Sequence, residues 1–199
     1  GSRLFTSYRA KETDNYVKKL EELGFIILGR SSTPEFGFKN ISDAQIHGPV
    51  NLPDDVTRNA GGSSGGAAAL VSSGISLLAP ASDGGGSIRI PASFNGLIGL
   101  KPTRGRIPVG PGSFRGWQGA SVQFALTKTV RDTKRLLYHM QTCQMESPFI
   151  LPKLSKVSLE EAVRPLKIAF STLSPIGGKV SESAIAATKK AARALESLG

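Results

Sequence analysis

The sequence predicts an α/β domain in which helices pack on a sheet of short strands. An amphipathic helical pattern in the first 25 residues is followed at once by four apolar residues, 25–28, and a second apolar run at 166–171 precedes another helical pattern. Short apolar runs are typical of buried strands, and apolar residues spaced three or four apart are typical of helices that pack on a core. The content of 39% hydrophobic and 20% charged residues is that of a globular protein.

The first helix is expected after Thr13 or Asp14, either of which can cap its N-terminus. Gly24 is placed to end it. Its apolar positions are Tyr16, Val17, Leu20 and Leu23. A strand is predicted at 25–28, and residues 31–60, rich in Ser, Asn, Asp, Pro and Gly, predict a long irregular connection of a kind that is often functional.

The middle of the chain predicts a helix of small residues at 67–73, ended by Gly74. A strand at 76–80 and a second apolar segment at 96–100 follow. Residues 102–119 contain several glycines and prolines and predict a loop.

A further helix is expected to begin at Thr129 or Asp132 and to carry Leu136, Leu137 and Met140. Residues 144–165 are weakly patterned, and we expect them to connect to a second lobe.

The last part of the sequence predicts a strand at 166–171 and then a helix capped by Ser181. Gly199 is a candidate C-cap. One face of this helix carries Ile185, Ala192, Leu195 and Leu198.

The charge pattern argues against a nucleic-acid site. The chain of 199 residues has a net charge of +10, but its Lys and Arg residues are scattered, with no run of five.

No stretch of 18 apolar residues and no apolar leader exist, so neither a membrane span nor a signal peptide is expected. The single cysteine, Cys143, cannot form an internal disulfide; it favours a cytoplasmic setting and no structural metal site.

Two glycine–serine stretches carry the candidate chemistry. They are Gly-Gly-Ser-Ser-Gly-Gly at 61–66 and Ser-Asp-Gly-Gly-Gly-Ser-Ile-Arg at 82–89. Glycine lets the backbone approach another group closely, and successive N–H groups of such loops can bind a phosphate or an oxyanion.

Two interpretations of these stretches fit poorly. A phosphate-binding Walker loop needs Lys and then Ser or Thr after its last glycine, whereas two alanines follow Gly66. A nucleophile elbow centred on Ser64 needs a preceding strand and a histidine, but the preceding residues make a poor strand. The two histidines, His47 and His139, are isolated in the sequence.

The third interpretation uses both serines and no histidine. A lysine held neutral can activate a serine hydroxyl, and a second hydroxyl can relay the proton between them. Ser63 and Ser87 stand 24 positions apart, from 63 to 87.

Taken together, these motifs resemble the amidase signature family of hydrolases. The resemblance is carried by residues 61–66, 83–92, 95–96 and 99–103 and extends to 28–37, 51–58, 126–132 and 167–175. It therefore covers the whole chain, 1–199, with the signature core at about 61–105. It implies part of an amidase signature fold, a mixed twisted β-sheet flanked by helices.

The resemblance also implies a mechanism without a cofactor. Ser87 is the nucleophile that attacks a carboxamide and forms an acyl-enzyme, and Ser63, in a cis peptide with Gly62, is the bridging serine. The implied oxyanion donors are the N–H groups of Gly84, Gly85, Gly86 and Ser87. An ion pair of Asp83 and Arg89 is expected to frame the glycines, with Ser64 and Ser82 in the same hydrogen-bond network. Lys101 is expected to be structural.

In one respect the sequence departs from the family pattern. The family's catalytic lysine precedes the stretch that resembles residues 1–5, and Lys11, Lys18, Lys19 and Lys39 do not match its context. We therefore expect a fragment that lacks the general base and the C-terminal part, is inactive alone, and self-associates through uncovered surfaces.

The expected function of the parent protein is hydrolysis of a small amide. The region after Gly105 is closer to bacterial amidases, including cyclic amide oligomer hydrolases. Residues 119–126 depart from the transamidating subunit of a tRNA-dependent amidotransferase. That subunit and a non-catalytic binding or assembly module remain the alternatives.

Overall fold

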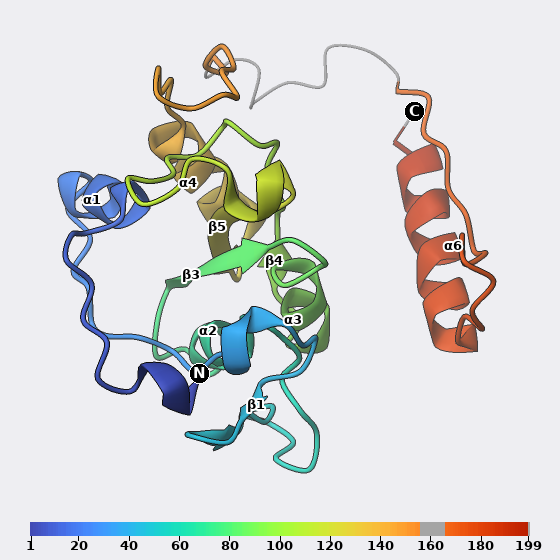
Figure 1. Ribbon diagram of the computed structural model, residues 1–199. Helices are drawn as coiled ribbons and strands as arrows, with labels where there is room; N and C mark the ends of the chain where they lie inside the picture. Colours follow the sequence, from blue (N-terminus) through green and yellow to red (C-terminus); the bar gives the residue numbers. More distant parts are fainter. Residues whose placement is uncertain (156–165, 199) are drawn as a thin grey trace. The chain divides into compact units, whose positions relative to one another are not determined.

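A computed structural model describes residues 1–155 and 166–198 (Figure 1). The chain divides into two compact units, Gly1–Leu159 and Glu160–Gly199, and each is described by itself. The connection expected at 144–165 is described only as far as residue 155. Within the described residues, no helix has both the length and the apolar character needed to cross a membrane.

The first unit is built on a three-stranded antiparallel sheet. Its order is β3 (Leu78–Asp83), β5 (Val122–Thr127), β4 (Ile98–Gly99), with Leu78 paired to Thr127 and Asp83 to Val122. Helices lie on either side of this sheet in Figure 1, so the predicted class of helices around a sheet is confirmed. The predicted strand at 76–80 overlaps β3, which extends to Asp83, and the predicted apolar segment at 96–100 contains β4.

Two elements of the core were not predicted. Strand β5 is central, and Phe124, Ala125 and Leu126 within it are buried. Helix α3 (Arg89–Phe94) contains a proline, Pro91. Proline is tolerated there because the first N–H groups of a helix have no partner within it.

Helices α1 and α4 cover the sheet and begin at predicted caps. Helix α1 (Asn15–Glu22) is capped by Asp14, whose side chain accepts from the Tyr16 N–H, and helix α4 (Val130–Met140) is capped by Thr129. The Tyr16 hydroxyl donates to the carbonyl of Phe124 at 2.7 Å, which fastens α1 to β5. Burial, and secondarily the charge of Asp14, raise the pKa of Tyr16, so the phenol stays neutral.

Helix α2 (Gly65–Ser72) begins two residues earlier than predicted and is followed by Gly74 at φ +82°. Its residues Ala67, Ala68 and Val71 belong to the core. The glycines of its first turn allow a neighbouring segment of the chain to pack closely against the helix. A Cβ on Gly66 would lie 2.5 Å from the backbone N and O of Ser32.

The long connection 31–60 is mostly irregular, as predicted. It contains a 3-10 turn, η2 (Glu35–Gly37), and a small hairpin of β1 (Asp43–Ala44) and β2 (Gly48–Pro49). A further 3-10 turn, η1 (Arg3–Phe5), lies near the N-terminus, and another, η3 (Gly116–Gly119), closes the predicted loop at 102–119.

The predictions of strands at 25–28 and 166–171 were wrong. Both segments are irregular, and Ile26 and Leu28 are 84% and 80% exposed. A strand needs a neighbour for its N–H and C=O groups, and the described residues provide none for either segment. Local apolar composition could not reveal this.

The second unit contains helix α6 (Glu182–Glu196). Ser181 caps it as predicted, with its Oγ accepting from the Ala184 N–H at 3.3 Å. None of the helix residues is buried within the described chain. The predicted C-cap, Gly199, lies outside the described residues.

Candidate active site

The first glycine–serine loop enters the site immediately before α2. The peptide bond between Gly62 and Ser63 is cis, and Ser63 is only 6% exposed. A Cβ on Gly62 would lie 2.7 Å from the carbonyl carbon of Ile41, so only glycine fits beside that backbone. Residues 61–64 are therefore packed firmly against the long irregular connection.

Ser42 joins the two sides of this contact. Its side chain is buried, donates to the carbonyl of Ser63 at 3.3 Å and accepts from the N–H of Gly65 at 3.1 Å. One hydroxyl thus satisfies the carbonyl and the N–H that stand on either side of Ser64.

Two asparagines hold the same loop. Asn59 Oδ1 accepts from the N–H groups of Ser42 and Gly61 at 3.3 and 2.9 Å, and its Nδ2 donates to the carbonyl of Ser42 at 3.1 Å. Asn95 Nδ2 donates to the carbonyls of Ala60 and Pro91, both at 2.8 Å, and so links the loop to α3. Ser42 and Asn59 were not predicted as site residues. In the sequence they are two of many polar residues in the connection 31–60, and nothing distinguishes them from the others.

The second glycine–serine loop is organised by the carboxylate of Asp83, at the end of β3. This side chain is completely buried. Its Oδ1 accepts from the N–H of Gly86 at 2.9 Å, and its Oδ2 accepts from those of Ile88 and Arg89 at 3.2 and 3.3 Å. The guanidinium of Arg89 adds two hydrogen bonds of 2.9 Å, from Nε to Oδ2 and from Nη2 to Oδ1.

These contacts fix the charge of Asp83. Burial alone would favour the neutral acid, but the hydrogen bonds from the Arg89 side chain and from the N–H groups of Ile88 and Arg89 hold its pKa below the ordinary value. The same bond raises the pKa of Arg89. The turn is therefore built around a pair that is ionised at neutral pH.

Ser87 lies at the half-buried tip of this turn, between β3 and α3. The following residue, Ile88, is fully buried and anchors it. Within residues 1–155, the Oγ atoms of Ser87 and Ser63 make no hydrogen bond, to each other or to other groups. Neither hydroxyl is therefore engaged by another group of residues 1–155.

The two loops are joined at Ser64. Its Oγ accepts from the N–H of Ser82 at 3.4 Å instead of capping α2. The side of Gly61 also faces α3, with a Cβ position 3.2 Å from the Cα of Pro91. The structure therefore brings together the segments of Ser63 and Ser87, which the sequence only spaces 24 positions apart (63 to 87).

The glycine N–H groups do not all remain open. That of Gly86 is already bound to Asp83, so this expected oxyanion donor is committed elsewhere. Gly85 faces open space, with no atom within 4 Å of a Cβ position. The remaining candidate donors are the N–H groups of Gly84, Gly85 and Ser87.

Three lysines of the first unit have partners away from the serines. Lys39 pairs with Asp43 at 3.1 Å, Lys19 pairs with Glu22 at 3.0 Å, and Lys101 donates to the carbonyl of Pro102. Within residues 1–155, none hydrogen-bonds to either serine.

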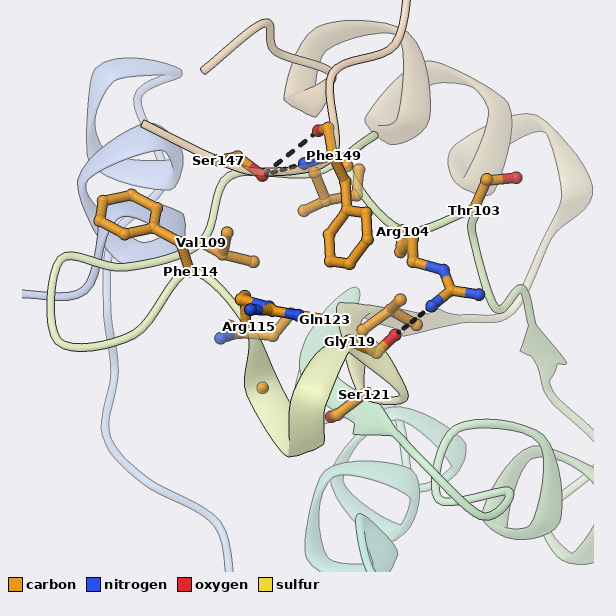
Figure 2. A pocket seen from close by; sticks show the side chains of 14 residues that line it. Thr103, Arg104, Val109, Phe114, Arg115, Gly119, Ser121, Gln123, Ser147 and Phe149 are labelled. Atoms are coloured by element: carbon orange, nitrogen blue, oxygen red, sulfur yellow. Dashed lines mark hydrogen bonds between the residues drawn. The ribbon is translucent and has the colours of Figure 1, made fainter. Parts of the chain in front are cut away.

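A cavity of about 20 Å³ lies apart from the serines (Figure 2). It is enclosed by the loop 103–123 and residues 147–149, and it has room for about one water molecule. Arg104 borders it, donates to the carbonyl of Gly119 at 3.2 Å and lies 5.2 Å from the centre of the Phe149 ring. This cavity is too small for an amide substrate, and its contacts brace η3.

Comparisons with known proteins identify the family of the chain. The family model described as Amidase matches residues 1–199. A lipoamidase of Enterococcus faecalis is 40% identical over 187 residues, which are 94% of this chain and 24% of the relative. The 6-aminohexanoate-cyclic-dimer hydrolase of Paenarthrobacter ureafaciens is 34% identical over 98% of this chain and 41% of its own.

Solved structures give the same result. A 6-aminohexanoate cyclic dimer hydrolase complexed with substrate superposes with a TM-score of 0.88 at 34% identity, over 96% of this chain and 41% of that one. A bacterial aryl acylamidase of the amidase signature enzymes gives a TM-score of 0.67 at 34% identity, over 73% of this chain and 30% of that one. The chain thus spans between a quarter and two fifths of these relatives' lengths, and by sequence and by fold it belongs to the amidase signature family.

Proposed function

We propose that the protein to which these residues belong hydrolyses a carboxamide C–N bond, with Ser87 as the nucleophile. The observation that carries this proposal is the set of hydrogen bonds that the Asp83 carboxylate accepts. Through three backbone N–H groups and Arg89 it holds the turn 83–89 rigid, with the unbonded hydroxyl of Ser87 at its half-buried tip. A fixed nucleophile beside unengaged N–H groups is the arrangement that acyl transfer requires.

The proposed reaction has two halves. Ser87 Oγ attacks the carbonyl carbon as its proton passes by way of the Ser63 hydroxyl to a general base. The N–H groups of Gly84, Gly85 and Ser87 stabilise the oxyanion, and each such donor contributes about 3 kcal/mol to transition-state stabilisation. The C–N bond breaks as the amine takes the proton and leaves, and water then hydrolyses the serine ester.

The general base belongs, in this proposal, to a part of the protein beyond these residues. The support is that no lysine of residues 1–155 hydrogen-bonds to Ser63 or Ser87, and that Lys39 is held by Asp43. The 199-residue chain alone is then inactive and tends to self-associate through exposed apolar segments such as 25–28.

A small-molecule amide is the proposed substrate. The relatives include a lipoamidase, a 6-aminohexanoate-cyclic-dimer hydrolase and an indoleacetamide hydrolase. Two of these names, lipoamidase and indoleacetamide hydrolase, state that an amide is cleaved.

The test is amide hydrolysis and fluorophosphonate labelling of the complete protein and of the 199-residue chain. Ser87→Ala should abolish both labelling and turnover, and Ser63→Ala should slow both by at least 100-fold. Ser73→Ala, at an exposed serine beyond the end of α2, is the matched control. Undiminished turnover in Ser87→Ala would overturn the proposal. Full activity in the 199-residue chain would overturn the assignment of the base.

A further inference from the structure

Two exposed aromatic side chains stack beside the proposed oxyanion loop. The rings of Phe38 and Trp117 have centroids 5.4 Å apart and an interplanar angle of 17°. They come from separate loops, yet 77% of Phe38 and 52% of Trp117 remain exposed. A stacked pair left this open presents a flat apolar surface to whatever binds next to it.

The pair lies near both serine loops. A Cβ on Gly84 would meet the Cε3 and Cζ3 atoms of Trp117 at 2.7 Å, so the indole rests on the backbone of the first oxyanion residue. Phe38 directly follows Gly37, whose Cβ position is 3.5 Å from the Oγ of Ser63. Trp117 therefore contacts the oxyanion loop, and Phe38 is one residue away from the glycine that lies beside the relay serine.

The backbone that presents these rings is strained. Trp117 and Gln118 have φ values of +50° and +56°, and Phe36 has +53°. Bulky residues avoid this region unless their surroundings impose it, and such residues cluster at binding sites. Around η3 the imposing contacts are those of Arg104 with Gly119 and Phe149 (Figure 2).

We propose that Phe38 and Trp117 form one wall of the substrate site and select amides with a planar apolar group next to the scissile carbonyl. This inference rests on the proposed function. It adds a specificity: a flat ring stacks on the pair with its carbonyl over Gly84 and Gly85, whereas a puckered ring of equal size loses that contact.

Trp117 is the only tryptophan of the chain, so its emission can report directly on the site. In the complete protein, the difference in emission between the parent and Trp117→Phe isolates this signal. We expect benzamide to change it saturably, at concentrations at least five-fold lower than cyclohexanecarboxamide. Phe38→Leu, which stays apolar but is not planar, should remove the preference, and Phe38→Tyr should retain it. Phe170→Ala, at an exposed phenylalanine of the second unit, is the control.

Equal affinity for the two amides, or no effect of Phe38→Leu, would overturn the aromatic wall. Fluorophosphonate labelling of Ser87 in the same samples separates this failure from that of the proposed function. If labelling persists, only the specificity is refuted; if Ser87 is not labelled, the nucleophile assignment falls as well.

Discussion

The Asp83 carboxylate and the Arg89 guanidinium form a two-pronged ion pair, with both N–O distances at 2.9 Å. Asp83 is fully buried, whereas the Arg89 side chain is 54% exposed. The pair therefore has a fixed buried end, which binds the backbone of the loop, and an outer end that covers it from solvent. Replacing Asp83 should therefore destabilise the loop more than replacing Arg89.

Asp83→Asn should destabilise the protein by about 3 kcal/mol, because it leaves Arg89 unpaired and replaces a shared acceptor with a donor. Urea unfolding monitored by circular dichroism measures the loss. Asp43→Asn, which removes only the surface pair with Lys39, is the control and should cost less than about 1 kcal/mol. Equal losses in the two variants would contradict a special role for Asp83.

The same residue predicts an acid dependence of stability. Because the folded-state pKa of Asp83 is lowered, its contribution is complete above the unfolded-state value of about 3.9 and is lost as the pH falls through the lower folded-state value. The difference in unfolding free energy between the parent and Asp83→Asn should therefore be constant near neutrality and shrink below about pH 4. A difference that stays constant down to pH 2 would show that the carboxylate is not the stabilising form.

Glycines of the site should tolerate alanine unequally. Gly66→Ala places a Cβ against the backbone of Ser32 and should cost about 2 kcal/mol, whereas Gly85→Ala meets no atom within 4 Å and should leave the melting temperature nearly unchanged. Thermal melts of the two variants compare them directly. A large loss at Gly85 would mean that its surroundings are more crowded than described.

Ser42→Ala should lower the unfolding free energy by about 2 kcal/mol, since it leaves the carbonyl of Ser63 and the N–H of Gly65 without this partner. It should also reduce kcat more than it raises KM, because Ser42 positions Ser63 without contacting substrate. Steady-state kinetics of the complete protein tests this. Ser113→Ala, at an exposed serine, serves as the reference, and a change confined to KM would argue for a direct substrate contact.

Much of the fold was predictable because its information is local. Caps such as Asp14 and Thr129 and stop signals such as Gly24 act within one or two turns, and the helices they bound were found. The serine motif predicted which segments come together. By contrast, residues 25–28 satisfy every local criterion for a strand, and strand formation depends on a neighbour that local sequence does not contain.

The elements that were missed depend on tertiary structure. Strand β5 is central because β3 and β4 both pair with it. The sequence of its own six residues does not indicate these partners. Ser42 and Trp117 gain their positions from contacts with Ser63 and Gly84, far along the chain. Side chains that act through such packing leave no periodic signal in the sequence.

The contact of Ile41 and Ser42 with the Ser63 loop limits where residues can be inserted into the connection 31–60. Surface connections usually accept extra residues, because little depends on their path. Here an insertion or a proteolytic cut between 40 and 43 would pull the backbone of Ile41 away from Gly62 and disconnect the hydroxyl of Ser42 from its two partners. A few residues later, the tip between β1 and β2 exposes Gln45 and His47 and can be lengthened or tagged without disturbing the serines.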